Sequence, residues 1–305
     1  MTGGRPIVDA GDVRETLRAA GLRARHGLSQ NFLTDLGVLE TILIEAGPEA
    51  GARVLEIGPG LGLLTGALLE AGTIVTAVEL DAGLAAFLRH RYATDLSEGR
   101  LHLVEGDALD QDLVHLVEPP YDVVANLPYH ITSPILHALL GEAPRPRRLV
   151  LMVQREVAER IAAPAGQMSY LSVFVQYHAR VRIATLVPAV AFEPEPSVES
   201  AVIVVDPYQE DDRLADGEQE DALWRLVQAA FRERRKMLHN VLARQLPIGA
   251  DRVDGALSRA GIDPDRRPQT LAVGEWLRLL EEIGPIGQDE RGRRRTIHTG
   301  RGGES

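Results

Sequence analysis

The sequence predicts an α/β fold with a mostly parallel, Rossmann-like sheet, followed by a small all-helical domain. Between residues 53 and 153, short apolar runs alternate with segments of helical spacing. This alternation is typical of βαβ units in a sheet covered on both faces. Beyond residue 222, the apolar residues follow helical spacing only. The chain of 305 residues is therefore expected to hold two domains of different class.

The elements are expected in the following order. Helices over 12–20 and 38–46 precede the alternating region. Within that region the pattern predicts strands at 53–58, 73–79, 101–105, 121–126 and 148–153, and helices at 63–71, 81–92 and 132–140. A helix over 154–160, an apolar core segment over 170–177, and strands near 181–187 and 200–205 follow. The last part is expected to form helices at 222–231, 235–245, 253–260 and 271–283.

Shifts in composition predict the domain boundaries. The acidic stretch before residue 222 has few apolar residues and indicates a linker, and the last residues lack apolar periodicity. The predicted divisions are an N-terminal extension (1–22), a Rossmann-like domain (23–208), an acidic linker (209–221), a helical RNA-binding domain (222–283) and a disordered arginine-rich tail (284–305).

The composition excludes several kinds of chemistry. The chain has no cysteine, so disulfides, thiolate zinc sites and a cysteine nucleophile are excluded. Its nine histidines form no HExxH-type pair, and no metal is expected. No apolar run approaches the about 18 residues of a membrane span, and Met1 to Pro6 lacks the apolar core of a signal peptide. A monomeric cytoplasmic protein without a membrane partner is expected.

The net charge of −11 is unusual for a protein that binds nucleic acid, but basic residues are clustered. The clusters with candidate RNA-backbone contacts are Arg147 and Arg148, and then Arg232, Arg234, Arg235 and Lys236, which are expected to start the second helix of the last domain. For each cluster taken singly, a solvated face is the better prior.

A glycine loop follows the first strand of the alternating region. Gly58, Gly60 and Gly62 allow a sharp turn and a close approach of a ligand to the backbone before the next helix begins. Glu79 ends the following strand about 20 positions later, where a ribose diol needs an acceptor. The third glycine of the dinucleotide fingerprint is replaced by Leu63, so the loop suits S-adenosylmethionine better than a pyrophosphate cofactor.

The segment Asn126-Leu127-Pro128-Tyr129, directly after a buried strand, is the sharpest motif. The nitrogen N6 of adenine is a poor nucleophile because its lone pair is delocalised into the ring. The side-chain oxygen of Asn126 and the carbonyl of Leu127 could accept both N6 hydrogens, while Tyr129 stacks on the ring. Pro128 stiffens the turn that aims them. The alternative is a simple turn that closes the strand.

Other candidate residues have alternatives of equal weight. Glu56 and Asp107 lie at expected strand ends, and Asp107 could accept from an adenine amino group or cap a helix. Gln30 and Asn31 could face a ligand or satisfy their own backbone. Phe192, between prolines of a stiff loop, could cover the second face of the base or anchor the loop in the core.

These motifs together resemble the KsgA/Dim1 family of ribosomal RNA adenine dimethyltransferases. The similarity extends from about residue 20 to 283. It rests on QNFL from Gln30, LEIGPGLGLLT from Leu55, VELD from Val78, GDAL from Gly106, NLPY from Asn126, QREVAERI from Gln154, FEPEPSVESAV from Phe192 and FRERRKMLHNVL from Phe231, in family order.

The resemblance implies a class I methyltransferase domain, S-adenosylmethionine as donor, and dimethylation of N6 on two adjacent adenosines near the 3′ end of small-subunit rRNA, with a pre-30S particle as partner. The donor-binding residues that we predict are Gln30, Asn31, Leu33, Glu56, Gly58, Gly60, Glu79, Leu80, Asp107, Ala108 and Asn126. The target base is assigned to Asn126, Leu127, Pro128, Tyr129 and Phe192.

Three alternatives compete with this function. A methyltransferase of the antibiotic-resistance type would act on large-subunit (23S) rRNA. The spelling NLPY and the RERRK cluster argue against it, whereas the arginine-rich tail mildly favours it. A DNA adenine methylase would normally carry a separate target-recognition region. An RNA-binding assembly factor without activity would not need an intact Asn126 and Tyr129.

Overall fold

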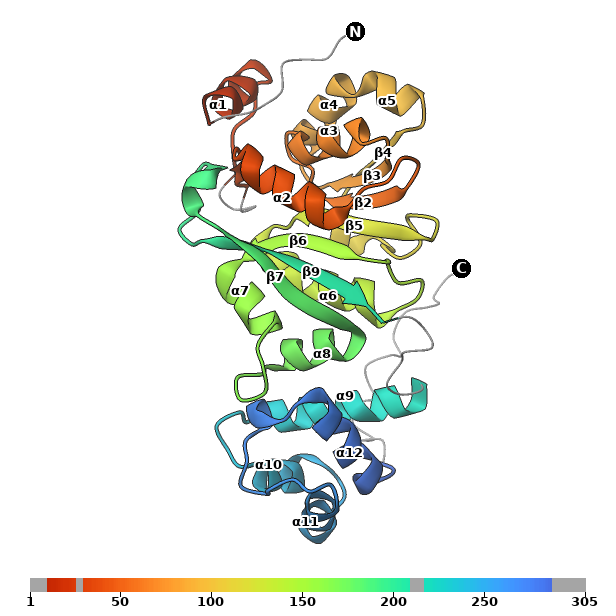
Figure 1. Cartoon of the computed structure of the whole chain (residues 1–305), viewed down its shortest axis with the longest axis vertical. Coiled ribbons are helices and arrows are strands. Elements are labelled where there is room, and N and C mark those ends of the chain that lie inside the picture. Colours follow the sequence, from red (N-terminus) through yellow and green to blue (C-terminus); the bar gives the residue numbers. More distant parts are fainter. Residues whose placement is uncertain (1–9, 26–29, 209–216, 287–305) are drawn as a thin grey trace, which may run out of the picture. The chain divides into compact units, whose positions relative to one another are not determined.

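The computed structural model describes residues 10–25, 30–208 and 217–286 (Figure 1). These residues form two compact units. The first unit comprises the described residues up to Ala163 together with those from Phe174 to Tyr208. The second unit comprises Pro164–Val173 and the described residues from Gly217 onward. Three predicted segments lie partly outside the described residues: 1–9 of the N-terminal extension, 209–216 of the acidic linker and 287–305 of the arginine-rich tail.

A seven-stranded sheet forms the centre of the first unit (Figure 1). The spatial order is β4 (Leu101–Glu105), β3 (Ile74–Glu79), β2 (Arg53–Ile57), β5 (Tyr121–Asn126), β6 (Leu149–Gln154), β9 (Ser200–Pro207) and β7 (Ala179–Val187). The first five strands are parallel, and β9 runs antiparallel to both of its neighbours. The predicted mostly parallel sheet is confirmed. The strand order reverses between β2 and β5, which is where ligands bind in open α/β sheets.

Helices cover the sheet on both faces. One face forms a single apolar core with α2 (Leu36–Ala46) and α3 (Leu63–Glu70). In β6, the residues from Leu149 to Val153 are at most 1% exposed, so the side chains that point to the opposite face are buried as well. The other helices of this unit are α1 (Ala10–Ala19), α4 (Ala82–Arg91), α5 (Ala93–Ser97), α6 (Thr132–Gly141) and α7 (Arg155–Ile161).

Two features were not among the predicted helices and strands. The apolar segment over 170–177 is a helix, α8 (Tyr170–His178), whose first residues belong to the second unit. The loop around Phe192 contains a two-residue strand, β8 (Phe192–Glu193), which pairs with β1 (Phe32–Leu33). Strands of two residues leave no periodicity in a sequence, because alternation needs about four residues to be recognised.

The second unit is mainly helical, with α9 (Gly217–Phe231), α10 (Leu238–Gln245), α11 (Ala250–Arg259) and α12 (Val273–Ile283). Residues 217–221, predicted as part of the linker, instead belong to α9, since acidic side chains favour the first turns of a helix. The prediction that Arg232–Lys236 start the next helix was also wrong. They form a turn, and α10 begins at Leu238, the first residue of its buried face.

Candidate active site

A cavity of the first unit lies at the carboxyl ends of β2, β3 and β5, at the reversal of strand order. Segments far apart in the sequence meet there. Its lining includes all the predicted donor-binding residues and four of the five predicted base-binding residues: Gln30, Asn31, Leu33, Glu56, Gly58, Gly60, Glu79, Leu80, Asp107, Ala108, Asn126, Leu127, Pro128 and Tyr129.

The glycine loop has backbone angles that other residues rarely adopt. Gly60 has φ 60°, and a Cβ atom there would lie 3.2 Å from the Phe32 ring. Gly62 has φ 83° and immediately precedes α3. Its carbonyl accepts a hydrogen bond of 2.6 Å from the Tyr92 hydroxyl, and a Cβ at this position would clash with the same tyrosine. Glycine at these two positions therefore lets the backbone turn between β2 and α3 without a clash.

Glu79 connects the glycine loop to the end of β3. One carboxylate oxygen accepts from the Gly60 amide at 3.1 Å, and the other accepts from the Asp81 amide at 2.8 Å. The side chain is 5% exposed, and burial raises its pKa, while these two amides act in the opposite direction. Each carboxylate oxygen thus has one lone pair engaged, and the remaining lone pairs can accept hydrogen bonds from a ligand bound against this wall of the cavity.

Glu56 lines the same wall of the cavity and is more deeply buried than Glu79. The residue is 1% exposed, and its carboxyl group accepts a 2.7 Å hydrogen bond from the Thr65 hydroxyl. Burial raises the pKa of Glu56 to about 8, and the nearby Glu79 carboxylate also raises it, so the group is protonated at neutral pH in the free protein. A cationic ligand would favour the ionised form.

Asp107 and Gln30 both line the cavity and both satisfy nearby backbone groups. Asp107 Oδ1 accepts from the Leu109 amide at 2.9 Å and so caps a short 3-10 helix (Ala108–Asp110). The Gln30 side-chain oxygen accepts from the Arg25 amide at 2.8 Å. The capping alternative for Asp107 and the local alternative for Gln30 are thus observed, and their contacts with a ligand stay predictions.

Two hydrogen bonds fix the groups that follow β5. The Asn126 side-chain nitrogen donates to the main-chain carbonyl of Asn31 at 3.3 Å, which leaves the amide oxygen to accept from a ligand. The Tyr129 hydroxyl and the Ser200 hydroxyl are 2.9 Å apart. Burial raises the pKa of Tyr129, so this partly buried ring is a neutral phenol. Ser200 is fully buried at the start of β9.

Phe192, the fifth predicted base-binding residue, does not line this cavity. The residue is 2% exposed and packs in the apolar core with residues of α2 and α3. Its backbone is held by pairing with Leu33. The structure therefore gives Phe192 the place of a buried loop anchor, which was the alternative to a stacking face.

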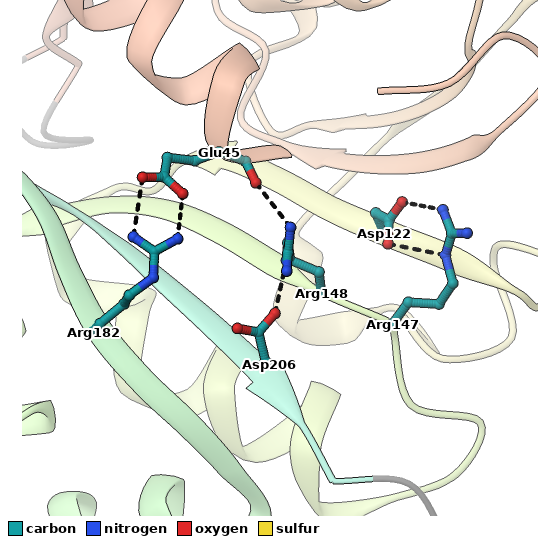
Figure 2. Close-up of polar contacts among 6 residues, drawn as sticks. All are labelled: Glu45, Asp122, Arg147, Arg148, Arg182 and Asp206. Carbon is teal, nitrogen blue, oxygen red and sulfur yellow. Dashed lines mark hydrogen bonds and ion pairs between the residues drawn. The ribbon is translucent and has the colours of Figure 1, made fainter. Parts of the chain in front are cut away.

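The two basic clusters differ in how their charges are used. Arg147 pairs with Asp122, and Arg148 pairs with Asp206 and donates to the main-chain carbonyl of Glu45 (Figure 2). In the second unit, Arg232 donates to the Gln245 side chain. Arg234, Arg235 and Lys236 are exposed and have no acidic partner among the described residues.

Sequence reasoning missed part of the cavity wall and its supports. Val13 of α1 lines the cavity, the Asn31 carbonyl orients Asn126, and Ser200 contacts a tyrosine 71 positions earlier. No local pattern links these positions. In the described parts of the chain, no group of three or more His, Asp or Glu side chains is placed to hold a metal ion, and no helix is long and apolar enough to cross a membrane.

Two solved class I methyltransferases share this fold. The crystal structure of a dimethyladenosine transferase from Plasmodium falciparum aligns with a TM-score of 0.69 and 28% identity, covering 83% of this chain and 97% of that one. The crystal structure of the 23S rRNA methyltransferase ErmE gives a TM-score of 0.67 and 29% identity, covering 83% and 99%. The fold and the cavity at its switch point make this chain a class I methyltransferase, a class that implies S-adenosylmethionine as methyl donor.

Sequence comparison identifies a family within the class I methyltransferases. "Ribosomal RNA small subunit methyltransferase A" of Geobacter sulfurreducens is 42% identical over 274 residues, which is 88% of this chain and 98% of that protein. The protein of the same name from Anaeromyxobacter sp. (strain K) is 40% identical over 284 residues, covering 89% and 97%. A profile of the ribosomal RNA adenine dimethylases matches residues 21–284. The chain belongs to this family of rRNA adenine methyltransferases.

Proposed function

We propose that this protein transfers two methyl groups from S-adenosylmethionine to N6 of each of two adjacent adenosines near the 3′ end of small-subunit rRNA, during assembly of that subunit. The observation that carries the proposal is the orientation of Asn126. Its amide nitrogen is held by the Asn31 carbonyl, so its oxygen is the group available to accept an N6 hydrogen. This arrangement suits an exocyclic amine as the acceptor of the methyl group.

The donor would occupy the wall made by the glycine loop, Glu79, Asp107 and Glu56. The backbone at Gly58 and Gly60 allows close approach, and the Glu79 carboxylate is placed to accept from a ribose diol. Glu56 is the acidic group for a cationic end of the donor. When bound, S-adenosylmethionine supplies a methyl group on a positively charged sulfur.

The protein residues would act mainly by orientation. Asn126 and the Leu127 carbonyl accept the N6 hydrogens and favour a pyramidal nitrogen, whose lone pair then forms the new bond to the methyl carbon. The electron pair of the breaking carbon–sulfur bond stays on sulfur, and the extra proton leaves N6 for water after transfer. No general base is required. Tyr129 stacks on the base, and its hydroxyl is held by Ser200.

RNA outside the base would contact the second unit. Arg234, Arg235 and Lys236 lie together in one exposed turn, and their charges are not engaged by carboxylates of the described residues. Such side chains suit the phosphate backbone, which positions RNA without reading its sequence.

The experiment that tests the proposal uses labelled donor and under-methylated 30S particles. Modified bases are then mapped by mass spectrometry of nuclease fragments. We expect N6,N6-dimethyladenosine at two neighbouring positions near the 3′ end of the small-subunit rRNA. Label confined to naked 23S rRNA would instead support the large-subunit alternative, and RNA binding without any methyl transfer would support an inactive assembly factor.

A further inference from the structure

The helix α1 has two faces with different chemistry. Val13 and Leu17, four residues apart, are buried in a small apolar cluster with residues of the glycine-loop region, and Val13 also lines the cavity. Arg14 and Arg18, also four residues apart, are exposed on another face. One side of the helix therefore closes the cavity while another carries cationic side chains beside it.

These arginines line a hollow on the surface of the first unit. Arg14 and Arg18 of α1 and Arg23 of the following segment form one side, and Glu193 and Pro194, at the end of β8, contribute to the lining. Its charged lining thus consists of three guanidinium groups and one carboxylate.

The single carboxylate does not neutralise the hollow. Arg14 contacts Glu193 at 3.4 Å, with the arginine side chain 61% exposed, and a pair of this kind contributes little. Arg18 and Arg23 have no carboxylate partner in the described parts of the chain. Most arginines elsewhere in the first unit are paired: Arg25, Arg53, Arg89, Arg100, Arg147, Arg148, Arg155 and Arg182. Cations without such partners are thus uncommon in this unit.

The hollow and the cavity are both lined by residues of the helix α1. The same helix contributes Val13 to the cavity, and β8 pairs with β1, whose Leu33 lines the cavity too. A strand whose base enters the cavity past α1 would pass its flanking backbone over this hollow. Adjacent phosphates of a strand lie only a few ångströms apart, so the two or three arginines of one hollow can contact successive phosphates.

We propose that the hollow lined by Arg14, Arg18 and Arg23 binds phosphates of the RNA strand that flanks the target adenosine. The proposal rests on the proposed function, because it takes RNA as the substrate. It gives α1 two tasks, to cover the donor and to hold the substrate strand. It also gives Glu193 an opposing role, because its carboxylate competes with phosphate for Arg14.

The test measures binding to under-methylated 30S particles between 50 and 200 mM salt at fixed magnesium. For the double variant Arg18→Gln with Arg23→Gln we expect binding about five- to twentyfold weaker at 100 mM salt, and a salt slope smaller by about 1.4 to 1.8, the value for two lost phosphate contacts. The turnover rate at saturating substrate and the affinity for S-adenosylhomocysteine should stay as in the wild type. Glu193→Gln should bind more tightly than the wild type.

A matched control is Arg89→Gln with Arg100→Gln, which removes two exposed arginines that already pair with carboxylates. It should leave the salt slope unchanged. An unchanged slope in the Arg18/Arg23 variant, or a loss of S-adenosylhomocysteine binding without a change in slope, would overturn the proposal. If the wild-type protein neither binds nor methylates the particles, the proposed function itself fails, which is a different result.

Discussion

At the scale of single residues, the cavity depends on groups that are held from behind. Asn126 donates from its amide nitrogen to the Asn31 carbonyl, so its amide oxygen can face the substrate. The Tyr129 hydroxyl contacts the Ser200 hydroxyl, so the face of its ring can stack on the base. A single neutral hydrogen bond contributes only about 1 kcal/mol to stability. Its effect on catalysis is of another kind, because it selects the side-chain orientation that the reacting amine meets.

The contact between Tyr129 and Ser200 leads to a prediction that a double-mutant cycle can check. Tyr129→Phe keeps the ring and removes its hydroxyl, whereas Ser200→Ala removes the partner. We expect each change to lower kcat by about fivefold, the equivalent of one hydrogen bond, with little effect on the affinity for S-adenosylhomocysteine. The double variant should be no slower than either single variant, because both remove the same interaction. Multiplying effects would show that Ser200 acts independently of the tyrosine.

Glu56 predicts how donor binding depends on pH. Its pKa of about 8 means that the free site carries a proton at neutral pH, which a cationic donor must displace. Affinity for S-adenosylmethionine should therefore rise as pH increases from 6 toward 8 and then level off. In Glu56→Gln, titration calorimetry should show a much weaker pH dependence and no proton release from this site. An identical pH profile in both proteins would contradict the assignment.

The same group affects stability in the opposite direction. A carboxyl with a raised pKa in the folded state stabilises the free protein fully below its ordinary pKa near 4.5. This contribution is lost as pH rises through about 8. Chemical unfolding of the donor-free protein should therefore show a decline over this window that Glu56→Gln reduces.

At the scale of elements, the carboxyl ends and the amino ends of the parallel strands have different roles. The carboxyl edge of β2, β3 and β5 presents Glu56, Glu79 and Asn126 to the cavity. The region near the amino ends of β5 and β6 holds an ion-pair network (Figure 2). There, Arg182 of β7 forms a two-pronged contact with Glu45 at the end of α2, which holds that helix on the sheet. The Arg182 guanidinium lowers the pKa of Glu45.

The arginines of the first basic cluster, Arg147 and Arg148, are paired with carboxylates, whereas Arg234 and Arg235 have no such partner among the described residues. We therefore expect the two basic clusters to have different roles. Arg234→Ala with Arg235→Ala should weaken RNA binding by about tenfold and flatten its salt dependence, since both charges are available to phosphates. Arg147→Gln with Arg148→Gln should leave RNA affinity within about twofold and lower the thermal midpoint, because Asp122 would remain largely buried without its partner. Binding titrations over a range of salt, with thermal unfolding of each variant, separate the two effects. The reverse pattern would place the RNA on the first cluster.

At the scale of the whole molecule, sequence periodicity predicted the class of fold and most elements to within about two residues. Each parallel strand was short, contained β-branched residues, and either ended in a polar residue or was followed by glycine. The strand ends and their side chains could therefore be placed together. The failures have a common physical origin. Arg147 finds its partner 25 residues away and Arg148 finds one 58 residues away, and no local pattern encodes such pairs. Phe192 was ambiguous because a proline-rich loop can bury or expose its aromatic residue.

The net charge of −11 does not exclude RNA binding, because RNA contacts a local group of cations and not the whole surface. Several arginines are paired with carboxylates of the same chain, and each such pair is neutral. What matters for RNA is which cations remain without such partners. Among the described residues these include Arg18 and Arg23 in the first unit and Arg234, Arg235 and Lys236 in the second. Local distribution, and not the sum, therefore decides the electrostatic footprint.

The central claim is that Asn126 steers the adenine amine toward the donor. The most direct measurement is single-turnover methyl transfer to under-methylated 30S particles by Asn126→Ala, with RNA affinity and S-adenosylhomocysteine affinity measured on the same preparation. We predict that transfer is slowed by at least about a hundredfold, the usual effect of removing an oriented polar group, while RNA affinity stays within about twofold. Transfer at the wild-type rate would contradict the claim.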